Sequence, residues 1–527
     1  MAKFALRKLI LTVVSMGIFA PISYFVYQEY IKSSTYSNFE VAADRLGFNG
    51  YKKADKYISA SEHQEALLTL FQMAGYFQPE NLWKAINGLG MKDPILTFKQ
   101  VYPAIKKSKA YQNDPNEFNA KILRKNLGKG TELDEQDIID LLLYISQNAF
   151  GRKSGQERNE LISKDWMNEY EEAYLKTAKI LNFIDRKVPE HQEYDGAWIA
   201  GASRIGIMTR IIDYNYILSK YNIKIKGETL ALAGARPLWA NIDGIAPTVR
   251  DRLIEAYKTT ANLDELDINL PIEEEKARIT EGKEYMSGLA ARYNIKLNYT
   301  SPFLQYNTVE ECPPGYFPGR VYPNYAIGES RKLTETLMSQ DLITTYLSDN
   351  TQNITIVDTL AEQYRRPTTA STARDAAKKF AEHIVNGDYG DKKEFIILFE
   401  TNNPYIERQT IATQRQVNEV LNEYELASKG YKIKVEGVGC KSKQGVATIH
   451  SELAALVAEK WKGASEYQSK NTPQKRAIED LLFQTRDHSE VAPLELDISE
   501  ISDLEVGNKI YLMNIYHNIM SFVLYKY

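Results

Sequence analysis

The stretch WIAGASRIGIMTR, Trp198–Arg210, decides the fold of this chain. A short apolar run ends at a glycine, a polar turn follows, and apolar residues then return at helical spacing. This order is typical of a β-strand that leads through a tight turn into an α-helix. Such a turn presents backbone amides at the start of the helix, where they favour an anion. The turn alone identifies no reaction, so its interpretation depends on the rest of the chain.

The same strand and helix pattern returns further along the sequence. Four or five such units predict an α/β fold, with a Rossmann-like, doubly wound and mostly parallel sheet. The first helix is expected after the opening glycine turn and to end at about residue 219. Further helices are expected over about 372–385, 405–424 and 448–461. The predicted strands are Ala197–Ala200, Glu228–Ala233, Ile354–Asp358, Phe395–Glu400 and Lys432–Val438.

Composition excludes several classes of protein. A chain of 527 residues with 43% hydrophobic and 25% charged residues is globular, and a net charge of -4 gives no case for nucleic acid as a partner. The two cysteines, Cys312 and Cys440, lie far apart, and the six histidines form no HExxH motif. We therefore expect neither a metal site nor a bound cofactor.

The amino terminus carries an uncharged run, Leu9–Tyr27, after Lys3, Arg7 and Lys8. Its length approaches the roughly 20 residues needed to cross a bilayer, and its bulky end does not suit a cleavage site. The run predicts an uncleaved signal-anchor helix, with residues 1–8 in the cytoplasm and the bulk of the chain on the outer side. The chain is then a single-pass membrane protein.

The spacing of apolar residues and the composition divide the remaining sequence into three parts. Residues 37–185 show apolar residues at three- and four-residue spacing, as in EHQEALLTLFQMAGYF, PENLWKAINGLG and DEQDIIDLLLYISQNAFG, which predicts a helical region. The α/β domain is expected over 195–461, with an insertion over about 251–325 that includes the loop-like CPPGYFPGRVYP. Residues 462–527 form a C-terminal extension that ends in a buried helix.

Ligands of open α/β sheets bind at the carboxyl ends of the strands. Arginine falls in several of the loops expected there, and arginine forms bidentate hydrogen bonds with phosphate or carboxylate. Together with helix amino termini, these loops predict an anion site. The candidate ligand-binding residues are Gly201, Ser203, Arg204, Gly234, Arg236, Arg366, Thr369, Thr372, Asn402 and Arg408.

A short-chain dehydrogenase is the alternative that the opening turn suggests. Ile205 stands where the middle glycine of that fingerprint would allow the pyrophosphate to approach. The Tyr-x-x-x-Lys spacing nearest the turn is Tyr216 with Lys220, on the very helix that follows it. The sequence therefore disfavours a nicotinamide cofactor.

The order of features resembles the SanA, ElyC and YdcF-like envelope family, known as domain of unknown function 218, over about residues 195–461. The matching stretches are WIAGASRIGIMTRIIDYNYIL, LALAGARP, LTETLMSQDLI, ITIVDTLAEQYRRPTTASTARDAA and FIILFETNNPYIERQ. In the family, a histidine follows the last of these strands, whereas this chain has Asn402-Asn403-Pro404-Tyr405. The family's acidic residue matches either Asp358 or Glu362. The resemblance implies a cell-envelope location and nucleotide-type ligands.

Two functions from different classes follow. The first is a membrane-anchored, envelope-facing protein that binds an anionic, phosphate-bearing small molecule or a lipid-linked precursor, with Glu335 or Asp358 as candidate acid or base. The second is a membrane-anchored scaffold or binding protein without catalysis. Convergence of the carboxylates and arginines would favour the first, and their scatter over separate surfaces would favour the second.

Overall fold

The computed structural model describes residues 39–53, 56–74, 171–234, 236, 238–266, 275–293, 333–346, 354–359 and 367–464, together with scattered positions from 135 to 170. The chain divides into two compact units. The first comprises residues 1–149, 163–181 and 497–510, and the second comprises 150–162, 182–496 and 511–527. Cys312, Arg366 and the helix expected at 79–90 lie outside the described residues.

The described part of the first unit contains a short antiparallel hairpin and several helical segments, the first of them over residues 39–45. Strands β1 (Tyr51–Lys53) and β2 (Lys56–Ile58) pair, and helices α2 (Ala60–Met73) and α9 (Glu171–Ile180) follow. The side chain and amide of Ser59 exchange hydrogen bonds with those of Glu62, which caps the start of α2. The helix expected from EHQEALLTLFQMAGYF is confirmed up to Met73, whereas the hairpin was not predicted.

The second unit is built on a five-stranded parallel sheet, which confirms the expected α/β fold. Its strands lie in the order β7-β6-β4-β8-β9. All four neighbouring pairs are parallel, and β4 occupies the centre. The five strands are β4 (Gly196–Ala200), β6 (Thr229–Gly234), β7 (Ile354–Thr359), β8 (Glu394–Asn402) and β9 (Lys432–Cys440). A separate two-stranded parallel pair joins β3 (Glu193–Tyr194) and β5 (Lys224–Ile225).

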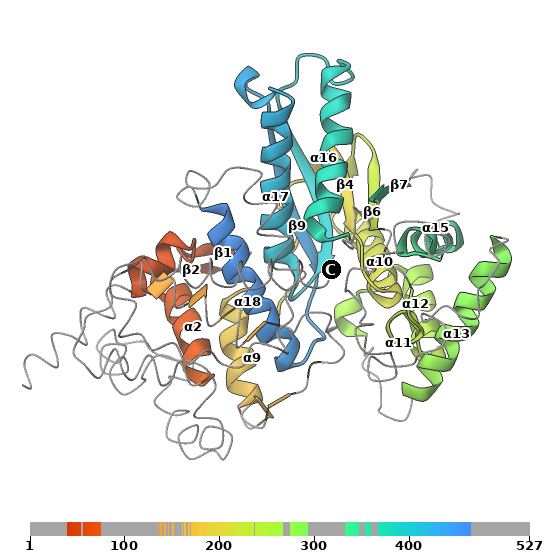
Figure 1. The fold of residues 1–527 in the computed structure, drawn as a ribbon, viewed down its shortest axis with the longest axis horizontal. Helices are drawn as coiled ribbons and strands as arrows, with labels where there is room; N and C mark the ends of the chain where they lie inside the picture. Colours follow the sequence, from red (N-terminus) through yellow and green to blue (C-terminus); the bar gives the residue numbers. More distant parts are fainter. Residues whose placement is uncertain are drawn as a thin grey trace, which may run out of the picture. The chain divides into compact units, whose positions relative to one another are not determined.

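Helices cover both faces of this sheet (Figure 1). On one face, α16 (Thr369–Val385) and α17 (Ile406–Glu423) pack on Trp198 and Phe399. On the other, α10 (Arg204–Lys220) packs on Ile199 and Leu398. Because successive strand residues face opposite ways, Trp198 and Ile199 enter different cores, and the strand is apolar throughout.

Further helices extend the α10 side. A core of buried side chains joins α10 to α12 (Pro247–Thr259), α13 (Glu275–Arg292) and α15 (Glu335–Tyr346). Most of α12 and all of α13 lie within the predicted insertion, so part of that insertion is helical. The short helices α11 (Ala240–Asp243) and η3 (Leu263–Glu265) connect these elements, while α18 (Val446–Gly463) packs against α17 and η6 (Ala427–Lys429) precedes β9.

The chain reverses its direction of winding between β4 and β8. Strands β6 and β7 lie on one side of β4, and the later strands β8 and β9 lie on the other. The loop after β4 leads to α10 and the loop after β8 leads to α17, so the two loops lead to opposite faces of the sheet. In open α/β sheets, ligands commonly bind at the carboxyl ends of the strands beside such a reversal. The opening turn, Gly201–Ser203, lies at this edge.

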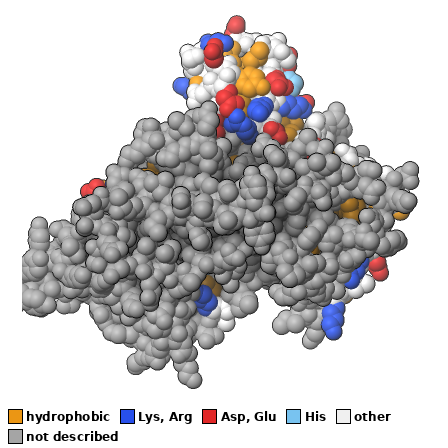
Figure 2. Space-filling model, viewed as in Figure 1, with side chains coloured by type: hydrophobic (Ala, Val, Ile, Leu, Met, Phe, Trp, Pro, Cys, Tyr) orange, Lys and Arg blue, Asp and Glu red, His pale blue; other side chains and the backbone are white. Residues whose placement is uncertain are grey.

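The amino end of the sheet carries charges of both signs. Figure 2 shows acidic and basic side chains gathered together where α16 ends and β8 begins, at the top of the view. Lys392 there contacts Asp195, Lys379 lies 2.8 Å from Glu228, and His383 lies 2.6 Å from Asp388. Mutual pairing accounts for these charges without a ligand.

The expectation of a membrane anchor is corrected. Among the described residues, no helix combines the length and the apolar character that crossing a bilayer requires. The segment on which the expectation depended, Leu9–Tyr27, lies outside the described residues. The interpretation as a single-pass protein with its bulk outside the membrane is therefore withdrawn.

Candidate functional site

The turn after β4 brings the chain against a carboxylate from another element. A Cβ added to Gly201 would overlap both Oε1 of Glu335 and the backbone oxygen of Leu232. Glycine is required here because of this close approach. The structure thus brings Glu335, a candidate acid or base, directly onto the predicted ligand-binding turn.

Ser203 is the N-cap residue of α10, and its side chain makes no capping hydrogen bond. The first turn of α10 contains no acidic residue, and Ser203 is half-buried. The amide of Arg204 donates to Asp243 Oδ1 at 3.3 Å. The helix start is therefore partly satisfied by an internal carboxylate, while the Ser203 hydroxyl makes no capping hydrogen bond to it.

Arg236 holds two carboxylates at this edge. Its Nε donates to Glu335 Oε2 at 2.9 Å, and Nη1 and Nη2 donate to Asp243 at 3.1 and 2.8 Å. Burial acts to lower the pKa of Arg236, but Asp243 and Glu335 together raise it well above its ordinary value. Arg236 therefore stays charged and fixes Glu335 against the turn.

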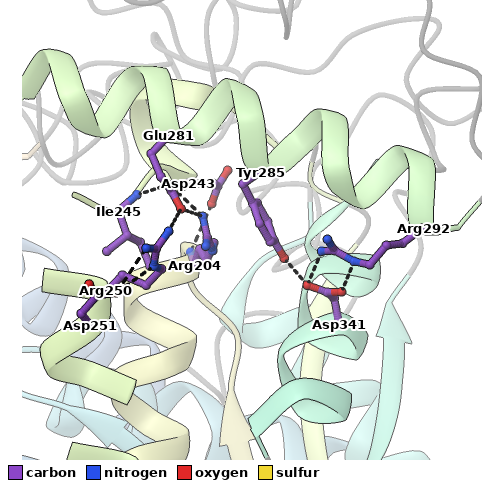
Figure 3. Close-up of polar contacts among 9 residues, drawn as sticks. All are labelled: Arg204, Asp243, Ile245, Arg250, Asp251, Glu281, Tyr285, Arg292 and Asp341. Carbon is purple, nitrogen blue, oxygen red and sulfur yellow. Dashed lines mark hydrogen bonds and ion pairs between the residues drawn. The ribbon is translucent and has the colours of Figure 1, made fainter. Parts of the chain in front are cut away.

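Arg204 forms a second internal pair. Its Nη1 donates to both oxygens of Glu281, at 2.8 and 2.9 Å, and Ile245 N donates to Glu281 Oε2 at 2.8 Å (Figure 3). The guanidinium lies 3.5 Å from the centre of the Tyr285 ring. Its Nε is buried and has no hydrogen-bond partner among the described residues.

The start of α16 reaches the same edge from the other face of the sheet. Thr368 and Ser371 form a capping box there. Pro367 lies so close to Gly234 that a Cβ on this glycine would overlap the proline ring. Gln409 Nε2 donates to Thr369 Oγ1 at 3.4 Å. Gly234 and Thr369 therefore both lie beside the start of α16.

Arg210, the last residue of the opening stretch, joins the loops after β4 and β8. Its Nη1 donates to the backbone oxygens of Ala200 and Gly201 at 2.8 and 2.5 Å. Its Nε donates to Asn402 Oδ1 at 3.1 Å. Arg210 thus spans the point where the winding reverses and positions Asn402.

Other predicted residues take different places. Arg408 donates to Glu452 Oε2 at 2.6 Å and so joins α17 to α18. Asp358 is exposed and accepts from Thr336 Oγ1 at 2.6 Å. Thr372 is buried in α16, where its hydroxyl donates to Thr369 O at 3.2 Å.

Each described arginine of the predicted anion site therefore has an internal carboxylate. Arg204 pairs with Glu281, Arg236 with Asp243 and Glu335, and Arg408 with Glu452. Because these charges are balanced within the chain, an anion at the edge would depend on backbone amides and on Ser203. Asp243 and Glu281 could not be identified from the sequence, because their arginine partners are brought to them by tertiary packing alone.

A pocket of about 580 Å³ adjoins this network on the side of α13 and α15. Tyr285 OH donates to Asp341 Oδ2 at 2.9 Å, and Arg292 donates to both oxygens of Asp341 at 3.0 and 2.9 Å (Figure 3). Burial and the charge of Asp341 raise the pKa of Tyr285. The pocket is lined by Arg204, Tyr285, Arg292, Tyr293, Asp341, Leu342, Thr344 and Thr345.

Two carboxyl groups, on α10 and β8, are buried in the described part of the second unit. Burial raises the pKa of Asp213 to about 6 even though Arg186 donates to both its oxygens, at 3.1 and 2.7 Å. Burial and the nearby Asp213 raise the pKa of Glu400 well above its ordinary value. The free thiol of Cys440 is also buried, which raises its pKa. All three groups lie inside the fold.

One group of side chains has the composition of a metal site. Ligand atoms of Glu190, His191 and Glu436 lie within 4.8 Å of one another. However, His191 Nδ1 lies 2.5 Å from Glu436 Oε2, while Glu436 Oε1 accepts from Glu190 N at 2.5 Å and from Tyr194 OH at 2.8 Å. These direct hydrogen bonds already account for the Glu436 carboxylate.

No family model, curated protein or solved structure matches this chain. The resemblance to the SanA, ElyC and YdcF-like family therefore stays a prediction.

Proposed function

We propose that this chain binds a small molecule with a phosphate or carboxylate group over the Gly201–Ser203 turn. In this proposal the sheet is a Rossmann-like, doubly wound one, and the ligand binds at the carboxyl ends of the strands beside its point of reversal. The observation that carries the proposal is the convergence on one turn of a helix start, a hydroxyl that makes no capping hydrogen bond and a fixed carboxylate.

The helix start supplies the attraction for an anion. Backbone amides of the first turn of α10 and the partial positive charge of the helix favour a negative group by about 0.3–1 kcal/mol. Ser203 can donate a hydrogen bond to the same group, because its side chain makes no capping bond. The paired arginines stabilise the turn instead of contacting the ligand.

Glu335 gives the site a group that can accept a proton or a hydrogen bond. Arg236 holds Oε2, while Oε1 lies against Gly201. A ligand seated on the turn would therefore meet Glu335 within hydrogen-bond reach, which a general base requires. Asp358 accepts a hydrogen bond from Thr336, which follows Glu335 in α15, and so helps to hold the start of this helix in place.

The test compares Ser203→Asp with Ser203→Asn. Asp and Asn are both good N-caps, so both variants should fold, but Asp places a negative charge where the ligand anion would lie. We expect inorganic phosphate or a nucleoside monophosphate to raise the melting temperature of the wild type and of Ser203→Asn, and to have no effect on Ser203→Asp.

Gly445→Asp is the matched control. Gly445 is the exposed N-cap of α18, and a Cβ there meets nothing within 4 Å, so the same charge is added at another helix start. This variant should respond to phosphate as the wild type does. Equal responses of Ser203→Asp and Ser203→Asn, or no response of the wild type, would refute the anion site and leave the non-catalytic scaffold.

A further inference from the structure

We propose that the pocket between α10, α13 and α15 binds a small zwitterion of the α-amino acid class. This site is distinct from the Gly201–Ser203 turn and does not depend on it. Its cavity of about 580 Å³ falls within the range of about 300–1,000 Å³ that is usual for small-molecule sites. It combines two tyrosine rings and a leucine with two arginines, an aspartate and two threonines.

The charges of the pocket select a ligand without net charge. Arg292 and Asp341 form a two-pronged ion pair in its wall, with side chains 51% and 9% exposed. A lone anion that took Arg292 would leave the buried Asp341 without that partner, and a lone cation on Asp341 would displace Arg292. Leaving a buried charge unpaired is costly. A zwitterion replaces each partner with a group of the same sign, so both charges stay satisfied.

Arg204 adds a donor for the carboxylate of such a ligand. The residue is 4% exposed and lines the pocket, yet its Nε has no hydrogen-bond partner among the described residues. A buried donor without a partner is rare and destabilising, and a ligand carboxylate would satisfy it. Glu281 neutralises the Arg204 charge, so the pocket as a whole stays balanced.

The remaining walls suit an apolar side chain and an ammonium group. Tyr285, Tyr293 and Leu342 offer apolar surface. The Thr345 hydroxyl donates to the backbone oxygen of Asp341 at 2.7 Å. The oxygen of this hydroxyl can therefore accept a hydrogen bond from an ammonium group. We therefore expect an amino acid with an aromatic or large aliphatic side chain.

Three ligands of similar size separate the charge patterns. L-phenylalanine carries both charges, whereas 3-phenylpropanoate and phenethylammonium carry one each. In isothermal titration calorimetry of the full chain at pH 7, we expect phenylalanine to bind with a dissociation constant of about 1 mM or tighter. The two singly charged compounds should bind at least about tenfold more weakly. Equal or tighter binding of either compound would overturn the proposal, as would no binding of phenylalanine.

Thr344→Trp tests the location of the site. Thr344 is exposed at the pocket, so a large ring there should fill the pocket without disturbing the core and should abolish phenylalanine binding. Thr259→Trp, at an exposed position in the last turn of α12, is the control and should bind phenylalanine normally.

Asp341→Asn tests the charge pattern and should weaken the binding of phenylalanine but not that of 3-phenylpropanoate. Unchanged binding by Thr344→Trp would also overturn the proposal, whereas Ser203→Asp should leave phenylalanine binding intact.

Discussion

At the scale of single residues, arginines hold the edge of the sheet together. Arg236 binds two carboxylates, and Arg210 binds two backbone oxygens and Asn402. Such charges tolerate burial because each has a partner and further hydrogen bonds. Their positions after strands could be read from the sequence, but their partners could not. Arg204 and Glu281 are 77 residues apart, and no local pattern connects them.

The buried carboxyl pair predicts a dependence of stability on pH. The folded pKa values of Asp213, about 6, and of Glu400 both lie above their ordinary values. The folded chain therefore holds protons that the unfolded chain has already lost. This contribution to the free energy of unfolding is fully present below about pH 4 and declines as the pH rises through about 6 and beyond.

Glu400→Gln removes one of these titrating groups and keeps its shape. We expect the variant to unfold at a higher temperature than the wild type at pH 8, and the difference to shrink at pH 5. Melting curves across this range provide the measurement. Glu394→Gln, on the exposed start of the same strand, is the control and should follow the wild type. A constant difference at all pH values would contradict the assignment.

At the scale of elements, the sheet could be predicted because its strands are buried on both faces. All residues of β4 and of β6 are buried, and such strands are continuous apolar runs that stand out in the sequence. The structure extends the predicted strands by no more than a few residues. The β1–β2 hairpin was missed, because its three-residue strands carry lysines and show no alternation.

The helices of the insertion were harder to predict. Helix α13 is mostly charged and polar, and its buried side chains, among them Met286 and Leu289, are few. A helix of this kind is defined by what packs on it, and its sequence carries a weak signal. Glu281, Tyr285 and Arg292 belong to this helix, so these members of the polar network could not be found from the sequence.

The capping box of α16 predicts a local effect on stability. Thr368 Oγ1 accepts from Ser371 N at 3.3 Å, and Thr368 N donates to Ser371 Oγ at 2.8 Å. Thr368→Ala should lower the free energy of unfolding by about 1 kcal/mol, because the helix start loses an acceptor. Urea denaturation would measure it. Thr259→Ala, in the exposed last turn of α12, should stay within about 0.5 kcal/mol of the wild type, and a similar loss there would contradict the capping role.

At the scale of the whole molecule, the two units have separate cores. The first buries Phe48, Leu67 and Tyr174, and the second buries the two faces of the sheet. The boundary at residues 181 and 182 lies close to the end of the helical region that the sequence predicted at 185. The discontinuous course of each unit was not predicted, because it depends on contacts distant in sequence.

This division predicts that residues 182–464 fold without the first unit. A chain of these residues contains the five strands and their covering helices, so it should give one cooperative thermal transition and the circular dichroism of an α/β protein. A shorter chain that ends at residue 430 lacks β9 and α18 and should lose the cooperative transition. The absence of a transition in the longer chain would show that its core needs the first unit.

The central position of β4 has a consequence for synthesis on the ribosome. One edge of β4 pairs with β6, which follows it closely in the sequence. The other edge of β4 pairs with β8, which is made about 200 residues later. At about 5–20 residues per second, this delay amounts to about 10–40 s. Throughout it, an apolar strand offers an open row of amides and carbonyls to any neighbouring nascent chain. Crowding of ribosomes on one messenger should therefore favour aggregation through β4, and holding by a chaperone until β8 emerges should suppress it.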